Sequence, residues 1–260
     1  MEAANLVASA PPADGSEAEG VVVFSAYYDS MSVVPAASPG AEQACSIAAL
    51  LELARTLERL PLKRRAVFVA MAGHCQALAG MRDFVRRYML PPEGEDDPAL
   101  DVEAFVGLDL SSHARRVGLF YKGHLVDQGE SRVQPWFSHL GKRWTEWATA
   151  YCEALGIEPD AAFVDGINSE QGRNWRTYLP TPMGFDAELA LLAGHVGLTF
   201  CTTNDARLTI DSPLDTPERV DFDNLAAQVR LLCCVVPNFF NTAGPFIRKP
   251  PINYWTRLEA

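Results

Sequence analysis

Nearly uninterrupted apolar runs of strand length alternate along the chain with longer stretches in which apolar residues recur every three or four positions. The short runs predict strands that are covered on both faces of a sheet. They lie at residues 21–26, 66–71, 104–110, 117–121 and 197–202. The periodic stretches predict amphipathic helices at residues 44–60, 77–88, 135–155 and 221–236. This alternation indicates a three-layer α/β/α sandwich whose mixed central sheet is mostly parallel.

Two of the expected helices carry a clear apolar face, which we expect to be buried. The face of the helix at 44–60 consists of Ile47, Leu50, Leu51, Ala54, Leu57 and Leu60. The face of the helix at 135–155 consists of Trp136, Leu140, Trp144, Trp147, Tyr151 and Leu155. An aromatic stripe of this kind is typical of a helix that packs on a core.

The two ends of the chain differ in composition from the part between them. Residues 1–19 are acidic and rich in Ala and Pro, so we expect a flexible linker there. The peptide between, residues 20–243, is expected to form one α/β domain, and the Pro-rich residues 244–260 a tail or linker.

A polar stretch at residues 166–184 is expected to be a long surface loop. It contains Arg173, Trp175, Arg176 and Tyr178, which makes it a candidate contact surface. An ordinary solvated loop is the simpler interpretation.

Composition excludes several classes of function. The 260 residues carry a net charge of −11, which argues against nucleic-acid binding because phosphates require a basic surface. No apolar stretch approaches the roughly 20 residues that span a bilayer. The first residues lack the basic and apolar regions of a signal peptide. The sequence does not determine the cellular compartment. The chain is also compatible with being part of a larger protein that is exported or anchored in a membrane. The six cysteines show no regular spacing, which favours buried free thiols over a disulfide framework and leaves a single bridge open.

Polar residues with chemical potential follow three of the expected strands. Tyr27 and Asp29 follow the first strand, His74 and Cys75 follow the second, and Asp109 lies at the end of the third. In parallel sheets, ligands bind at the carboxyl ends of the strands. We therefore expect these side chains to build one site.

Five short motifs connect these positions in sequence order. They are Ala26-Tyr27-Tyr28-Asp29-Ser30, Pro39-Gly40-Ala41-Glu42-Gln43-Ala44-Cys45-Ser46, Gly73-His74-Cys75-Gln76-Ala77-Leu78-Ala79-Gly80, Phe185-Asp186 and Asp211-Ser212-Pro213-Leu214-Asp215-Thr216. Together they resemble the motifs of the co-catalytic zinc exopeptidases of the bacterial leucyl aminopeptidase type, over about residues 20–236. That superfamily also contains glutaminyl cyclases, the transferrin receptor, nicastrin and nicalin. The resemblance implies the same three-layer fold and, in an intact member, an aminopeptidase site with two zinc ions.

The resemblance also implies that the metal site of this chain is degenerate. The family's site needs a histidine, a bridging aspartate, a general-base glutamate, a ligand glutamate, a further acidic ligand and a second histidine. Those positions hold, in that order, Tyr27, Gln43, His74, Cys75, Asp109 and Asp211, and Asp29 stands where an orienting carboxylate is expected. Only Asp109 keeps the expected type.

This replacement removes the charge that two zinc ions require. A bridging carboxylate and further anionic ligands must offset about four positive charges. Gln43 is neutral, and the phenol of Tyr27, with an unperturbed pKa of about 10, is a poor zinc ligand at neutral pH. We therefore favour a catalytically inactive peptidase-fold domain without a cofactor, acting as a binding or structural module of a larger protein, with a protein or peptide partner. In such a site, Tyr27 and Gln43 are expected to donate hydrogen bonds to Asp109 and Asp29.

The alternative hypothesis is a metal-dependent aminopeptidase or amide hydrolase with an altered ligand set. A single zinc would then be held by His74, Cys75, Asp109 and Asp211, which are all competent ligands. Adjacent side chains at a strand end diverge, which disfavours His74 and Cys75 on one ion. The remaining histidines, His113, His124, His139 and His195, are scattered and are interpreted as surface or core residues.

Overall fold

The computed structural model describes residues 3–12, 20–90, 100–125, 130–168, 174–179 and 184–241. Its elements in chain order are β1 (Leu6–Ala10), β2 (Val21–Tyr27), α1 (Cys45–Glu58), β3 (Arg65–Met71), α2 (Ala79–Phe84), the π-helix η1 (Val85–Met89), β4 (Val102–Asp109), β5 (Val117–Phe120), α3 (Glu130–Leu155), α4 (Pro159–Ala162), β6 (Phe163–Asp165), the 3₁₀ helix η2 (Trp175–Tyr178), α5 (Asp186–Leu192), β7 (Gly197–Thr202), the 3₁₀ helix η3 (Pro217–Arg219) and α6 (Phe222–Asn241).

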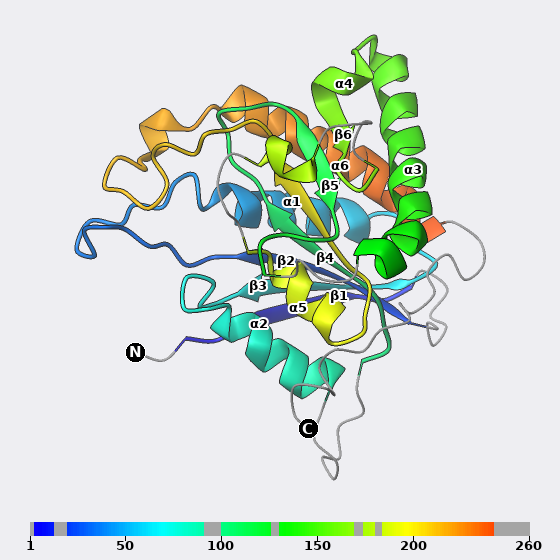
Figure 1. Cartoon of the computed structure of the whole chain (residues 1–260), viewed down its shortest axis with the longest axis horizontal. Coiled ribbons are helices and arrows are strands. Elements are labelled where there is room, and N and C mark those ends of the chain that lie inside the picture. The colour runs from blue at the N-terminus through cyan, green and yellow to red at the C-terminus, as the bar shows by residue number, and fades with distance from the viewer. Residues whose placement is uncertain are drawn as a thin grey trace.

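The strands form one mixed sheet in the order β1-β3-β2-β4-β7-β5-β6 (Figure 1). Strands β3, β2, β4 and β7 run parallel to one another. β1 is antiparallel to β3, and β5 is antiparallel to β7. The predicted mostly parallel, mixed sheet is confirmed. Consequently the carboxyl ends of β2, β3, β4 and β7 lie at the same edge of the sheet.

Helices cover both faces of the sheet, which gives the predicted three layers. α1, α3 and α6 pack on one face, and α2, η1 and α5 pack on the other (Figure 1). Successive residues of a strand point to opposite faces. Phe24 therefore lies in the core beneath α1 and α6, while its neighbour Val23 lies in the core beneath α5 and α2. Because both faces are buried, β2 has to be apolar along its whole length.

The N-terminal segment departs from the expected linker. Leu6–Ala10 forms the edge strand β1, in which Leu6 lies opposite Ala70 of β3. The linker prediction is wrong for this stretch, because an edge strand that buries little of its surface carries no strong apolar pattern. Residues 13–19 and the tail at 244–260 lie outside the described residues.

The predicted helices exist, with corrections to their faces and ends. In α1 the buried face includes Ala49 and Leu53, whereas Leu51 is 60% exposed. α3 begins at Glu130 rather than at residue 135. α6 continues past Pro237, and Phe239 and Phe240 of its last turn pack in the core. None of the described helices combines the length and apolar character that crossing a membrane requires.

Part of the stretch predicted as a contact surface, the 3₁₀ helix η2, contributes to the core. Trp175 and Tyr178 of η2 are buried in a small cluster with Phe120 and Phe185. A solvated loop at residues 166–184 is therefore incorrect around η2, and these two aromatic rings are not available to a partner. Arg173 lies outside the described residues.

Candidate functional site

A pocket of about 590 Å³ opens at the carboxyl ends of β2, β3 and β4. Its lining consists of Tyr27, Gln43, His74, Cys75, Ala77, Leu78, Asp109, Leu125, Gly184, Arg207, Ile210 and Asp211. Six of the seven residues that the sequence nominated line this one pocket. The seventh, Asp29, lies behind it and accepts hydrogen bonds from the backbone N–H groups of His74 (3.2 Å) and Cys75 (3.4 Å). The predicted convergence of the strand ends is therefore observed.

Asp109 at the end of β4 is paired with a buried arginine. Nη1 of Arg207 donates to Oδ1 of Asp109 at 2.6 Å, and Nη2 donates to the backbone carbonyl of the same residue at 2.8 Å. Both side chains are only 7% exposed. Burial opposes the charge of the guanidinium, but the carboxylate of Asp109 outweighs it and the pKa of Arg207 lies above its usual value. The pocket thus contains a permanent internal cation.

Tyr27 and His74 form a stacked pair on the pocket wall. Their ring centroids are 4.1 Å apart with an interplanar angle of 18°. Burial, reinforced by the charge of Asp109, raises the pKa of the Tyr27 phenol, which stays protonated at neutral pH. Tyr27 therefore presents a neutral ring to the pocket.

His74 interacts with α5. Its Nδ1 lies 3.3 Å from Oδ1 of Asp186. Burial disfavours the charged imidazole, but the hydrogen bond and charge of Asp186 outweigh it, so the pKa of His74 is raised. Asp186 thereby orients His74.

The polar residues across the pocket also pair with one another. Nε2 of Gln43 donates to Oδ1 of Asp211 at 2.9 Å, and Oε1 of Gln43 accepts from the backbone of Met31 at 3.3 Å. Burial raises the pKa of Asp211, and the charge of Asp215 adds to the effect. Burial, followed by the charge of Asp29, raises the pKa of the Cys75 thiol to about 11. Cys75 is therefore a neutral thiol at physiological pH.

These contacts correct the predicted hydrogen-bond scheme. The donors to Asp109 come from Arg207, and the donors to Asp29 are backbone amides. Gln43 donates to Asp211 instead. The expected compensation of negative charge is present, but its source is an arginine that the sequence did not single out.

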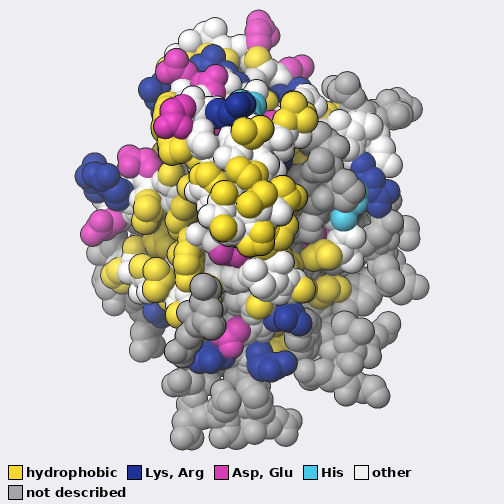
Figure 2. All heavy atoms as spheres, turned by 90° about the vertical axis from the view of Figure 1, so that its left-hand side faces the viewer, with side chains coloured by type: hydrophobic (Ala, Val, Ile, Leu, Met, Phe, Trp, Pro, Cys, Tyr) yellow, Lys and Arg dark blue, Asp and Glu magenta, His cyan; other side chains and the backbone are white. Residues whose placement is uncertain are grey.

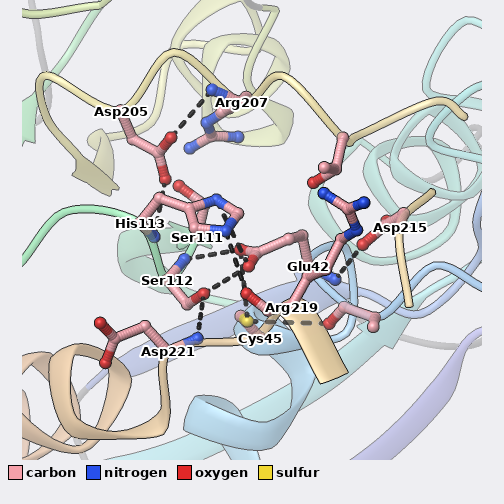
Figure 3. Close-up of polar contacts among 12 residues, drawn as sticks. Glu42, Cys45, Ser111, Ser112, His113, Asp205, Arg207, Asp215, Arg219 and Asp221 are labelled. Carbon is pink, nitrogen blue, oxygen red and sulfur yellow. Dashed lines mark hydrogen bonds and ion pairs between the residues drawn. The ribbon is translucent and has the colours of Figure 1, made fainter. Parts of the chain in front are cut away.

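A second polar cluster surrounds the side chain of Glu42, the residue before Gln43 in the chain (Figure 3). The backbone of Ser112 donates to Oε2 of Glu42 at 2.6 Å, and the Ser112 hydroxyl donates to Oε1. Nδ1 of His113 lies 3.6 Å from Oε1 of Glu42. The backbone of His113 donates to Asp205 at 3.1 Å, and the backbone of Arg207 donates to the other oxygen of Asp205 at 2.8 Å. This cluster joins the loops that follow β4 and β7.

Donor atoms of Glu42, His113 and Asp205 all lie within 4.8 Å of one another, a spacing that a metal ion could bridge. In the part of the chain that the structure describes, no three of the ligand atoms of His74, Cys75, Asp109 and Asp211 all lie within that distance of one another. The carboxylates of Glu42 and Asp205 already accept hydrogen bonds on both oxygens.

The pocket residues do not fit the two zinc ions of an intact aminopeptidase. The amide nitrogen of Gln43 points at Asp211, and an amide nitrogen does not coordinate zinc. The guanidinium of Arg207 contacts Asp109, and like charge opposes a cation at that carboxylate. His74 faces Asp186. The donor set thus lacks both the ligands and the negative charge.

Sequence reasoning missed Arg207, Asp186 and the cluster around Glu42. Arg207 is 98 residues from Asp109 in the chain, in a loop without a recognisable motif. Asp186 belongs to the short Phe185-Asp186 motif, which by itself assigns it no role. The sequence indicates only that the negative charge of Asp109 needs a positive partner. That requirement does not identify which of the arginines supplies it.

Comparison with solved structures places the fold among the zinc aminopeptidases. BSAP, a zinc aminopeptidase from Bacillus subtilis, is 17% identical, with a TM-score of 0.61 over 93% of this chain and 51% of that chain. The aminopeptidase from Aneurinibacillus sp. strain AM-1 is 16% identical, with a TM-score of 0.60 over 96% and 50%. The gamma-secretase component nicastrin is 11% identical, with a TM-score of 0.60 over 94% and 44%. The chain therefore spans about half the length of these structures, and the likeness establishes the fold alone.

A comparison with curated proteins gives no match. The model of peptidase family M28 matches residues 5–161, which is more than half of the 260 residues and includes the pocket from Tyr27 to Asp109. The fold and this match agree, and the chain belongs to peptidase family M28.

Proposed function

We propose that this M28 domain is catalytically inactive and independent of metal, and that it serves as a binding or structural module for a protein or peptide. The observation that carries the proposal is the buried ion pair between Arg207 and Asp109. An arginine at this carboxylate supplies the positive charge that a metal would otherwise provide.

Electrostatics support this assignment. A divalent cation at Asp109 would lie next to a guanidinium whose pKa is raised and which cannot lose its proton. Displacing the guanidinium would leave its charge buried without a partner, at a cost of several kcal/mol. The carboxylate of Asp109 is therefore occupied by its ion pair with Arg207 and is not free to bind a metal ion.

The other pocket residues lack the means to activate water. Hydrolysis of an amide needs a general base of matched pKa and an electrophile or metal that stabilises developing negative charge. The phenol of Tyr27 and the thiol of Cys75 are both protonated at neutral pH. His74, oriented by Asp186, can accept a proton, but without a metal it has no acidified water to act on. Binding is the activity that such a pocket retains.

The alternative function, a metal-dependent aminopeptidase or amide hydrolase, draws support from the grouping of Glu42, His113 and Asp205. Those three residue types are competent zinc ligands. Of the three, only Glu42 is adjacent in sequence to a ligand position that the resemblance implies, namely Gln43. A zinc ion there would be lost on changing His113→Ala and retained on changing His74→Ala.

The two functions are separated by metal content and turnover. The purified chain is dialysed against zinc and then against buffer, its metal content is measured by elemental analysis, and hydrolysis of aminoacyl p-nitroanilides is followed with and without chelator. We expect substoichiometric zinc and no chelator-sensitive hydrolysis. Stoichiometric zinc accompanied by such hydrolysis would overturn the proposal, and the two histidine variants would then locate the ion.

A further inference from the structure

We infer that the two loops beside the pocket form a docking surface for a polypeptide segment that combines apolar with basic side chains. The loops are residues 28–44, after β2, and residues 204–216, after β7, and both project from the same side of the molecule (Figure 1). The inference rests on the proposed function in one respect, namely that the pocket serves binding rather than hydrolysis.

Both loops expose large apolar side chains, which we call the apolar rim: Met31, Val33, Val34, Leu208 and Leu214. Leu208 is 85% exposed and Val33 is 79% exposed. Leu214, Val34 and Met31 are 55%, 47% and 46% exposed. Single exposed apolar residues are ordinary, but a contiguous group marks an interaction site. Figure 2 shows hydrophobic side chains gathered at the centre of the face on which these loops lie.

Backbone contacts hold the two loops together. The N–H of Val33 donates to the carbonyl of Asp211 at 2.8 Å, and the N–H of Ala41 donates to the carbonyl of Asp215 at 3.1 Å. Gln43 adds a side-chain bond to Asp211. The rim is therefore a preformed surface rather than two independent loops, which lowers the entropy cost of binding.

The second loop is held in a strained conformation. Asn204, Arg207 and Asp211 have φ angles of 59°, 49° and 63°, in the left-handed region that non-glycine residues rarely adopt. The cluster around Asp205 and the Arg207–Asp109 pair fix this shape. Such strain persists where the surroundings impose it and is concentrated at binding sites.

The rim continues into the pocket. Ile210 and Asp211, between Leu208 and Leu214, line the pocket of about 590 Å³. An extended segment lying on the rim can therefore place one side chain in the pocket beside Asp211. A flat lipid surface would contact the rim but could not fill the pocket.

Charge selects the chemistry of the partner. Of the acidic residues in the two loops, Asp29 and Asp211 are partly exposed, whereas Glu42, Asp205 and Asp215 are buried. The loops contain one basic residue, Arg207, which is buried on Asp109. A partner with Lys or Arg beside its apolar residues complements this surface. A second copy of the chain would bring like charges together, since each copy carries a net charge of −11. Anionic lipid would be repelled for the same reason.

The test uses two pools of fluorescein-labelled decapeptides. In both pools alternate positions are a random mixture of Leu, Ile, Val, Phe and Met, and the intervening positions are Lys and Arg in one pool but Asp and Glu in the other. Binding to the whole chain is followed by fluorescence anisotropy. We expect the basic pool to bind about tenfold more tightly than the acidic pool or better, in line with close charge complementarity.

Loop variants locate the surface. The double change Val33→Ser and Leu208→Ser should weaken binding of the basic pool by about tenfold, because a few apolar anchors carry most of the binding energy. The matched control, Leu51→Ser and Leu155→Ser, changes residues that are 60% and 57% exposed on α1 and α3 and should leave binding unchanged. Asp211→Asn keeps a residue that tolerates the left-handed conformation and should reduce the preference for the basic pool. Unchanged melting temperatures confirm that the rim and control variants fold.

Several results would overturn the inference. These are equal or absent binding of the two pools, a rim variant that binds like the control, a dimer in sedimentation that the rim variant disperses, and rim-dependent co-sedimentation with phosphatidylcholine vesicles. The last two would assign the rim to a second copy and to lipid, respectively. Zinc-dependent hydrolysis would defeat the proposed function without changing the peptide result, so the two failures remain distinguishable.

Discussion

Arg207 is the residue on which the character of the pocket depends. A buried carboxylate at the end of a strand requires a nearby positive charge, and here the positive charge is part of the protein. The guanidinium donates directional hydrogen bonds to both the side chain and the backbone carbonyl of Asp109. A spherical metal ion imposes no such donor geometry. This geometry fixes the loop after β7 against the end of β4.

Removing Arg207 should destabilise the domain strongly. Arg207→Met leaves Asp109 buried without its partner, and we expect a loss of about 3–5 kcal/mol in the free energy of unfolding, measured by urea denaturation. Changing Asp109→Leu together with Arg207→Met should recover part of this loss, because the uncompensated charge is then gone. The control is Arg55→Met, whose partner Glu52 lies on the surface at 3.7 Å, with an expected loss below about 1 kcal/mol. Equal losses for Arg207→Met and Arg55→Met would mean that the buried pair is dispensable.

His74 should make stability depend on pH. Its pKa in the folded protein is raised, above an unfolded value of about 6.5. The contribution of His74 is therefore fully present below about pH 6.5 and is lost as the pH rises through the folded pKa. His74→Phe retains an aromatic ring against Tyr27, so the stability difference from wild type should be larger at about pH 5.5 than at about pH 8.5. In an Asp186→Asn background this pH dependence should shrink, and a difference that is the same at both pH values would argue against the His74–Asp186 interaction.

At the scale of elements, the site depends on close packing of α5 on β7. Asp186, which holds His74, is the first residue of α5, and the helix approaches the sheet at Gly197. A Cβ added at Gly197 would lie 2.0 Å from the backbone carbonyl of Ala187, so the glycine is required for this approach. The position of the His74 partner is thus fixed by a residue outside the pocket.

Gly197→Ala should therefore displace α5. We expect a loss of about 1–3 kcal/mol in stability from overpacking, together with a weaker His74–Asp186 interaction, seen as a lower His74 pKa in an NMR titration. Gly107→Ala on the adjacent strand β4 is the control, because its Cβ would meet its nearest atom, the hydroxyl of Thr199, at 3.4 Å. Equal effects of the two substitutions would show that α5 adjusts freely.

At the scale of the whole molecule, the fold of peptidase family M28 surrounds a pocket that contains a buried ion pair. The carboxyl ends of the parallel strands meet at this pocket, and the negative charge of Asp109 is balanced there by Arg207. We therefore expect that placing the family's ligand types at these positions is not sufficient to create a metal site, since the arginine would remain.

This leads to a prediction for a restored site. The variant Tyr27→His, Gln43→Asp, His74→Glu, Cys75→Glu and Asp211→His should bind little zinc while Arg207 remains, because like charge opposes the ion. Adding Arg207→Ser should produce zinc binding, measured by elemental analysis after dialysis. Zinc binding by the five-residue variant with Arg207 intact would show that the arginine does not exclude metal, and no zinc in either variant would mean that these positions are not the family's ligand positions.

The sequence was sufficient for features that arise from local pattern. Buried strands such as Gly197–Thr202 and the helix Cys45–Glu58 follow from apolar runs and helical periodicity, and three strand ends predicted where the pocket lies. It was insufficient for β1, because an exposed edge strand lacks a burial pattern. It also misassigned Trp175, whose burial depends on packing against Phe120 and Phe185, which lie outside its own 3₁₀ helix η2.

The sequence itself determined which residue types stand at the positions that the resemblance assigns to metal ligands. Which group neutralises Asp109 was decided only by the tertiary structure. Arg207 and Asp109 are 98 positions apart, and their pairing depends on how the loop after β7 folds back over β4. Ion pairs between distant residues leave no periodic trace in a sequence, so charge balance in this pocket could be anticipated while its source could not.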